Sequence, residues 1–284
     1  MKRRSAEDFR QTVLRVEKLY SIPQVLSRAL RLVRQPDVSV GQIADLVMND
    51  AALSADFLHL SNSALFRGGE PCTRLTDAIQ RLGTKELIRV ISLSLSKNVY
   101  GKDLANYGIT AGQYWTESVW AALFMDALAR QANADPSEAY VVGILHQLGR
   151  VLINEAILEA GWSLFWDGRE AIERWEADHV GFTYAEAGAL LLQRWEFPEA
   201  IIAPVAHQLT APTPNGPDNF SNLLRFTRVC LLTADPAHLY RFSRVNVPDT
   251  LFRSFGFNNP HEFRESLDDT TARVGDIRRG LAAS

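Results

Sequence analysis

Three arginines, Arg28, Arg31 and Arg34, are the first side chains along this chain whose types and spacing could bind a charged partner. Residues three apart in an α-helix lie near one another, so their guanidinium groups could meet phosphates or the carboxylates of an acidic partner. Residues 1–34 carry nine Lys or Arg and three acids. Because no aromatic residues alternate with the arginines to stack on bases, we expect either a protein-facing surface or a solvated helix face.

Residues that could do covalent chemistry are few. The two cysteines, Cys72 and Cys230, match no CxxC or zinc-ribbon spacing, which favours buried thiols in a reducing compartment. The sequence contains no GxSxG nucleophile elbow, no GxxxxGK[ST] phosphate loop and no GxGxxG dinucleotide fingerprint. These absences argue against a GxSxG-type serine hydrolase and against the common nucleotide-binding loops.

The composition is that of an ordinary globular protein: 284 residues, 46% of them hydrophobic and 22% charged, with a net charge of −3. The longest uncharged apolar stretch, Ser118–Met125, is far shorter than the roughly 20 residues that a membrane span needs. The first residues turn acidic where a signal peptide would be apolar. We expect a cytoplasmic protein that binds neither membranes nor nucleic acid.

The elements that position these residues are predicted to be helices throughout, because the apolar residues follow helical spacing and no stretch shows β alternation. Capping boxes at Ser39/Gln42, Thr110/Gln113 and Thr183/Glu186 and the Asp135-Pro136 pair mark helix starts. The predicted helices cover residues 5–20, 23–35, 40–48, 51–61, 76–82, 85–99, 111–131, 136–146, 184–195, 198–207, 223–232, 260–267 and 271–281.

We divide the chain into three parts. Residues 1–100 form an N-terminal helical half, and residues 101–209 form a second helical half that opens with a linker at 101–109. Residues 210–284 form a C-terminal helical appendix, because residues 210–219 hold three prolines and a glycine.

The strongest local pattern runs from His59 to Phe66, His-Leu-Ser-Asn-Ser-Ala-Leu-Phe, and continues at 75–83 as Leu-Thr-Asp-Ala-Ile-Gln-Arg-Leu-Gly. Ile-Pro-Gln-Val-Leu at 22–26 precedes it, and Gly-Ile-Leu-His-Gln-Leu-Gly-Arg at 143–150 follows. These four motifs in this order resemble the HDOD family over about residues 16–209. The resemblance implies an all-α module of bacterial signalling, a non-catalytic relative of the HD-domain metal-dependent phosphohydrolases.

The resemblance also shows where this chain departs from the metal-binding pattern. Glu117 stands where the first His of the phosphohydrolases falls, and their His-Asp pair is His146-Gln147 here. Tyr184 replaces a further His, and residues 225–233 lack the terminal Asp. Too few ligands remain for a catalytic metal site, which generally needs three. A rebuilt site from Glu117, His146, His207 and His179 is the alternative. Otherwise we expect His146 to be partly buried and bonded to Glu117 or Gln147.

The motif residues Asn62, Ser63, Ala64 and Gly83 have a simpler interpretation. Asn62 and Ser63 can bond nearby backbone and end a helix, and Ala64 permits close packing. Gly83 is typical of a helix stop. These residues are therefore structural, or form an interaction surface.

These observations predict a compact all-α module that regulates through protein contacts in a bacterial signalling pathway, without catalytic residues, metal or cofactor. The alternatives are a divergent metal-dependent nucleotide phosphohydrolase and a sensor that binds a nucleotide or another small molecule in the former active-site cavity without hydrolysing it.

Overall fold

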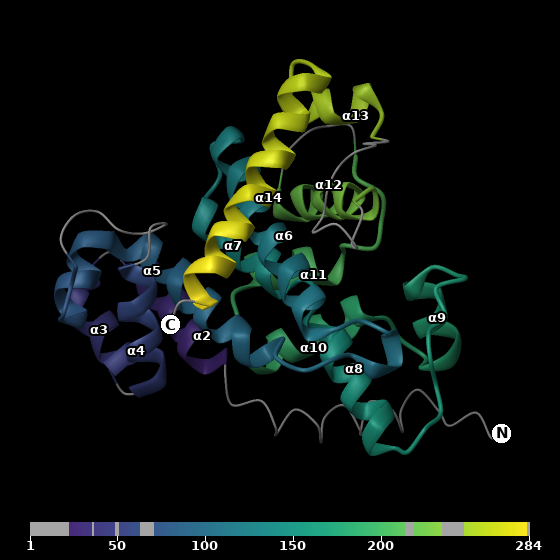
Figure 1. The fold of residues 1–284 in the computed structure, drawn as a ribbon, viewed down its shortest axis with the longest axis horizontal. Coiled ribbons are helices and arrows are strands. Elements are labelled where there is room, and N and C mark those ends of the chain that lie inside the picture. Colours follow the sequence, from purple (N-terminus) through teal and green to yellow (C-terminus); the bar gives the residue numbers. More distant parts are fainter. Residues whose placement is uncertain are drawn as a thin grey trace.

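The computed structural model describes residues 23–35, 37–48, 51–62, 71–213, 219–234 and 247–282. Within these ranges the regular structure is helical, as predicted (Figure 1). One isolated β-bridge, which was not expected, joins Leu104 and Ile109. The helices are α2 (Pro23–Val33), α3 (Val40–Met48), α4 (Ala51–Ser61), α5 (Leu75–Val99), η2 (Ala105–Tyr107), α6 (Ala111–Gln131), α7 (Pro136–Leu145), α8 (Leu148–Glu159), α9 (Ile172–His179), α10 (Tyr184–Arg194), α11 (Glu199–Ala206), α12 (Phe220–Leu232), α13 (Asp249–Ser254) and α14 (Pro260–Ala282).

The N-terminal part places α2, α3 and α4 against the long helix α5. The predicted cap of α3 is present, since Gln42 N donates to Ser39 Oγ and Ser39 N donates to Gln42 Oε1. The predicted stop at Gly83 is a kink within α5, where the backbone adopts φ 77°. Such a φ is accessible to glycine at little cost, so the two predicted helices continue as one bent helix.

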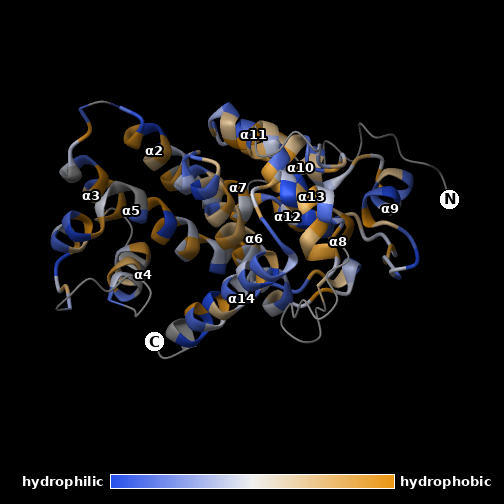
Figure 2. Cartoon of the chain, turned by 90° about the horizontal axis from the view of Figure 1, so that it is seen from above, coloured by the Kyte–Doolittle hydropathy of each residue, from blue (hydrophilic) through white to orange (hydrophobic). Residues whose placement is uncertain are grey.

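The pair α6 and α7 lies at the centre of the molecule (Figure 2). Nine of the 10 residues of α7 and 13 of the 21 residues of α6 are buried. Thr110 and Gln113 form the predicted capping box of α6, and the Asp135 side chain accepts from the first turn of α7. The two helices approach closely at Gly143, where an added Cβ would lie 2.5 Å from Ala122 Cα. This contact fixes the position of the turn that follows α7.

Helices α8 and α10 cross at a second glycine contact. A Cβ on Gly149 would lie 1.9 Å from the carbonyl oxygen of Tyr184, and one on Gly188 would lie 3.3 Å from Gly149 N. The close crossing brings the start of α8, which follows His146-Gln147, against the start of α10. It therefore determines the surroundings of the candidate site.

The C-terminal helices α12 and α14 both pack on α6. Phe226 on α12 packs against Phe124 on α6 and Phe263 on α14, and Trp120 Nε1 donates to Thr271 Oγ1. The two helices predicted at 260–267 and 271–281 are the single helix α14. Thr270 and Thr271 lie inside it and donate their hydroxyls to the Ser266 and Leu267 carbonyls.

The segment at 101–109 is more than a linker. Asn106 and Tyr107 in η2 are buried, and Asn106 N donates to Asn154 Oδ1 on α8.

The sequence signals did not predict helices α8, α9 and α13. The predicted helix at 5–20 and the motif residues Ser63 and Ala64 lie outside the described residues. One stretch, Pro136–Glu159, has the length and hydropathy of a membrane span, and it is 89% buried inside the protein, as core helices are.

Candidate functional site

A buried arginine, Arg150, lies among Glu117, Gln147 and Tyr184, the residues that the family resemblance places at metal-ligand positions. It lies in the first turn of α8, and its side chain is 10% exposed. Arg150 Nη1 donates to Gln147 Oε1 at 2.6 Å and lies 4.0 Å from Glu117 Oε1 on α6. The guanidinium group therefore contacts both residues that the sequence places at the first His and at the Asp of the His-Asp pair.

Tyr184 covers the other side of this guanidinium. Arg150 Cζ lies 4.5 Å from the centre of the Tyr184 ring, and Arg228 Cζ on α12 lies 5.9 Å from it. A cation over an aromatic ring is stabilised by the negative electrostatic potential of the ring face, and more strongly where water is excluded. Tyr184 is fully buried, and its hydroxyl has no hydrogen-bond partner among the described residues. Tyr184 thus joins Glu117 and Gln147 around Arg150.

A second buried group, Glu176 on α9, borders the cluster. Its carboxylate accepts from the Tyr107 hydroxyl at 2.8 Å and from Tyr184 N at 2.7 Å. Burial raises the pKa of Glu176 to about 7, although Arg150 and these two hydrogen bonds oppose the shift. Glu176 therefore changes charge near neutral pH and ties α9 to the start of α10.

The charge of Arg150 is maintained by its neighbours. Burial by itself lowers the pKa of an arginine, but Tyr184, Glu117 and Glu176 together raise the pKa of Arg150 above its usual value. Arg150 thus remains a cation, which is the charge that a metal would supply in this place.

His146 has a different environment from the predicted one. The ring is fully buried, and its Nδ1 lies 2.6 Å from the Gly143 carbonyl oxygen rather than from Glu117 or Gln147. The reason is that His146 caps α7, so its ring folds back on the preceding turn. Burial lowers the pKa of His146 to about 3, and the ring is neutral at physiological pH.

The other two histidines of the alternative metal site lie apart from this cluster. His207 follows α11 with an exposed side chain, and His179 is exposed with Nδ1 2.9 Å from the Trp175 carbonyl oxygen. No group of three His, Cys, Asp or Glu in the described part of the chain could hold a metal ion. A divalent cation does not fit these residues, since the Gln147 oxygen is already bonded to Arg150 and the approach of a second cation would be repelled.

Asn62 and Gly83 have clear structural contacts. The Asn62 amide donates to the Cys72 carbonyl at 2.8 Å and accepts from Cys72 N at 2.7 Å. These two hydrogen bonds tie the end of α4 to the segment before α5. Gly83 forms the kink in α5 described above. Cys72 and Cys230 are buried free thiols, as predicted.

The arginines of α2 connect two parts of the chain. Arg34 Nε donates to Glu138 Oε1 on α7 at 2.7 Å, and Arg31 Nη1 lies 3.1 Å from Glu196 Oε2 and donates to the Glu196 carbonyl. Arg28 is exposed, while Leu26, Ala29 and Leu30 on the opposite face of the helix are buried. Two of the three arginines thus have partners within the chain, which the sequence pattern did not indicate.

The described part of the chain has an all-α fold of the kind found in HDOD domain proteins of known structure. The profile of the HDOD domain matches residues 19–211, and the chain belongs to this family. An HDOD domain protein of Geobacter sulfurreducens has the same fold, with a TM-score of 0.62 at 19% identity over 98% of this chain and 96% of that one.

Other similar proteins carry different names. A structure named as a candidate phosphohydrolase of Shewanella amazonensis SB2B aligns with a TM-score of 0.64 at 22% identity over 95% and 98% of the two chains. A candidate signal transduction protein of Marinobacter aquaeolei VT8 gives 0.65 at 19% identity over 98% and 61%. An uncharacterized protein of Treponema pallidum is 29% identical over 221 residues, 74% of this chain. This chain spans only 41% of the length of that relative.

Sequence reasoning missed Arg150, Glu176, Tyr107 and Arg228 as members of the cluster. A signal was present for Arg150, which follows Gln147 by three residues and therefore falls on the same face of the helix. Glu176 and Arg228 are distant in sequence, and only the folded chain brings them to this place.

Proposed function

We propose that this protein is a non-catalytic regulatory module of bacterial signalling that acts in the cytoplasm through protein contacts. The observation that carries the proposal is the position of Arg150. Its guanidinium is held by Gln147, lies near Glu117 and packs on Tyr184. These are the positions from which a phosphohydrolase would hold its metal.

A resident guanidinium accounts for the departures from the metal-binding pattern together. An amide in place of the metal-binding Asp can accept from an arginine, and a tyrosine ring in place of a His can cover it. A buried cation also stabilises the Glu117 and Glu176 carboxylates without a metal. Each replacement therefore suits an arginine better than a divalent ion.

The Marinobacter protein, which is named for signal transduction, supports a signalling role by its fold. The Shewanella protein supports the runner-up, a metal-dependent phosphohydrolase. Both structures are under 25% identical to this chain, so the choice between them rests on the chemistry around Arg150. A small-molecule sensor in the former active site is a weaker alternative, because the cavities described for this protein are lined by other residues.

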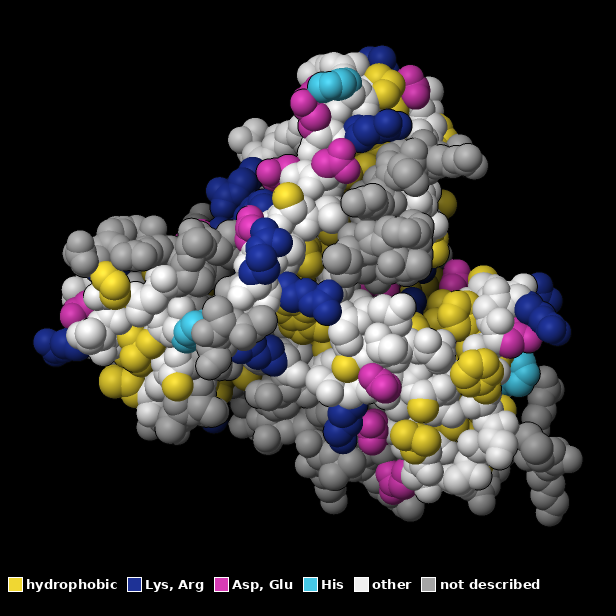
Figure 3. All heavy atoms as spheres, viewed as in Figure 1, with side chains coloured by type: hydrophobic (Ala, Val, Ile, Leu, Met, Phe, Trp, Pro, Cys, Tyr) yellow, Lys and Arg dark blue, Asp and Glu magenta, His cyan; other side chains and the backbone are white. Residues whose placement is uncertain are grey.

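The surface on α2 remains the first place to seek a protein partner. Arg28 is exposed. The neighbouring side chains of Arg31 and Arg34 are 41% and 42% exposed, although each forms an ion pair. Such a face can orient an acidic partner and lose its effect at high salt. On the face shown in Figure 3, by contrast, acidic and basic side chains are interspersed along α14.

The test combines an activity assay with a capture assay. We expect the purified protein with Mn²⁺ to hydrolyse bis(p-nitrophenyl) phosphate no faster than buffer does. In extracts of the bacterium that encodes it, we expect Arg28→Gln to reduce capture of acidic proteins at low salt. The matched control is Arg264→Gln, which changes an exposed arginine on α14. It should capture the same acidic proteins as the native protein. Metal-dependent turnover would contradict the proposal, and equal capture by all three proteins would place the interface elsewhere.

A further inference from the structure

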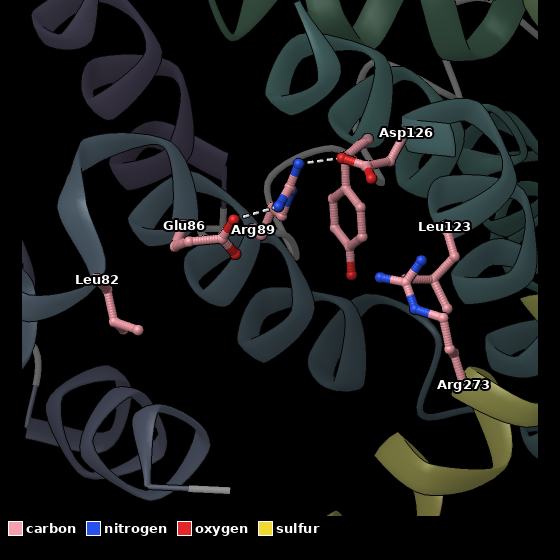
Figure 4. A pocket seen from close by; sticks show the side chains of 7 residues that line it. Leu82, Glu86, Arg89, Leu123, Asp126 and Arg273 are labelled. Carbon is pink, nitrogen blue, oxygen red and sulfur yellow. Dashed lines mark hydrogen bonds and ion pairs between the residues drawn. The ribbon is translucent and has the colours of Figure 1, made fainter. Parts of the chain in front are cut away.

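A second polar cavity lies away from the Arg150 cluster. It has a volume of about 260 Å³ and opens where α5, α6, α7 and α14 meet (Figure 4). Its lining consists of Leu82, Glu86, Arg89, Leu123, Asp126, Tyr140 and Arg273. None of these residues belongs to the HDOD motifs, apart from Leu82.

The acids of this cavity are already neutralised. Arg89 is buried and bonds both Glu86 and Asp126, and Arg130 Nε donates to the second oxygen of Asp126 at 3.0 Å. Two arginines thus compensate the two carboxylates. The Nε of Arg89 is buried and has no hydrogen-bond partner among the described residues, although a buried N–H group normally has one.

Arg273 adds a positive charge that nothing in the described chain compensates. It extends from α14 into the same space as Arg89 (Figure 4), is half-buried, and forms no ion pair or hydrogen bond with the described residues. Asp269 and Asp276, the acids one turn away on α14, do not pair with it; Asp276 pairs with Arg279 instead. The lining alone is balanced in charge, with Glu86 and Asp126 against Arg89 and Arg273, and Arg130 adds a further cation at Asp126 from outside the cavity. Because Arg89 and Arg130 engage the two acids, Arg273 is the arginine of the lining that is left without an ion-pair partner among the described residues.

Tyr140 contributes a further donor. The residue is 2% exposed and lines the cavity, and its hydroxyl makes no hydrogen bond within the described residues. Burial raises the pKa of Tyr140 above its usual value, so the hydroxyl keeps its proton and can donate. The cavity thus offers N–H and O–H donors from Arg273 and Tyr140, while both of its carboxylates are engaged by arginines.

We propose that this cavity binds a small oxyanion, a carboxylate or phosphate group, held by Arg273 and the Tyr140 hydroxyl. A guanidinium fork matches the geometry of both groups. The volume is several times the ~30 Å³ of a water molecule and lies just below the range of about 300–1,000 Å³ of most ligand sites. It suits a small anionic metabolite.

Occupancy of this site has a structural consequence. Arg273 belongs to the C-terminal helix, Glu86 and Arg89 to the N-terminal part, and Asp126 and Tyr140 to the central pair. A bound oxyanion bridges Arg273 and Tyr140 and so holds α14 on α7. The ligand therefore stabilises the packing of α14 against the rest of the protein. This inference goes beyond the regulatory role proposed above.

The experiment measures binding of two probes, inorganic phosphate and acetate, against chloride at equal ionic strength. We expect at least one probe to raise the melting temperature of the native protein and to bind in calorimetry. Arg273→Gln should weaken that binding at least tenfold, and Tyr140→Phe should weaken it while keeping the cavity shape. Arg264→Gln, on the same helix and exposed, should bind as the native protein does.

Two results would overturn the proposal: no effect of either anion on the native protein, or equal binding by the native and Arg273→Gln proteins. Arg150→Lys should bind the probes normally, because Arg150 lines a different part of the molecule. A loss of binding in Arg150→Lys would place the anion in the former metal site and would also contradict the proposal.

Discussion

The guanidinium of Arg150 lies 4.5 Å from the centre of the Tyr184 ring, at the place where α8 and α10 cross. Gly149 permits this contact, because any side chain there would collide with the Tyr184 carbonyl. The residue that carries the charge and the residue that permits the close crossing are thus neighbours in sequence. A single short segment determines both the packing and the electrostatics of the cluster around Arg150.

The first prediction concerns the charge of Arg150. Arg150→Met should lower the free energy of unfolding by about 2–4 kcal/mol, since it leaves the buried Glu176 and the partly buried Glu117 without their cation. Arg150→Lys keeps the charge but loses the guanidinium hydrogen bond to Gln147, so it should lower the free energy of unfolding by less than Arg150→Met does. Urea unfolding of both variants measures this order. A Met variant as stable as the Lys variant would show that the charge is unimportant.

The second prediction concerns Gln147. A carboxylate at this position would lie near Glu117, and the two like charges would destabilise the fold unless a cation lies beside them. Because Arg150 Nη1 lies 2.6 Å from Gln147 Oε1, we now expect Gln147→Asp to change stability by less than about 1 kcal/mol. It should create no Mn²⁺-dependent phosphodiesterase activity. Turnover by this single variant, measured with a nitrophenyl phosphate diester, would contradict the account.

The third prediction tests the glycine crossing. Gly149→Ala should destabilise the protein by about 3 kcal/mol, because its Cβ would lie 1.9 Å from a backbone oxygen that cannot move independently. Gly112→Ala, in the first turn of α6 with nothing within 4 Å, is the matched control. It should be neutral or stabilising by up to about 1 kcal/mol. Equal melting temperatures for the two variants would disprove the close crossing.

The fourth prediction follows from the pKa of Glu176, which is about 7 in the folded protein and near 4.5 in the unfolded chain. A folded-state pKa above the unfolded value means that the folded protein binds the proton more tightly. Its contribution to stability is complete below pH 4.5 and is lost as the pH rises through 7. Between pH 5 and 8 the native protein should lose about 1–3 kcal/mol from this group.

Glu176→Gln cannot ionise and should lack this part of the pH dependence. The measurement is the difference between the unfolding free energies of the native and variant proteins across this range, which cancels the titration of His146 and other groups. Glu159→Gln, at the exposed end of α8, is the control and should follow the native curve. A difference that does not change with pH would show that Glu176 stays charged.

Local signals in the sequence predicted much of the fold. The capping boxes at Thr110/Gln113 and Thr183/Glu186 and the Asp135-Pro136 start all appear where expected, because these bonds form between residues close in sequence. The break expected between 267 and 271 did not occur. Threonines reduce helix propensity, but the packing of α14 on α6 and the Trp120–Thr271 hydrogen bond outweigh that preference.

The site was predicted less completely than the fold. The family pattern identified Glu117, Gln147 and Tyr184, and the structure brings these three together around Arg150. In the structure His207 is exposed, and the His146 ring contacts the Gly143 carbonyl oxygen. The hydrogen bonds of Glu176 and the approach of Arg228 depend on contacts between distant segments, which spacing along one chain does not reveal.

The central claim is that an arginine supplies the positive charge where the phosphohydrolases hold a metal. The most direct test is elemental analysis of the native protein after incubation with Mn²⁺, Fe²⁺ and Zn²⁺ followed by dialysis. The account predicts well below one equivalent of any of these metals, because Arg150 and Gln147 leave too few ligands. One equivalent of a metal that survives dialysis and is lost in Glu117→Ala would contradict it.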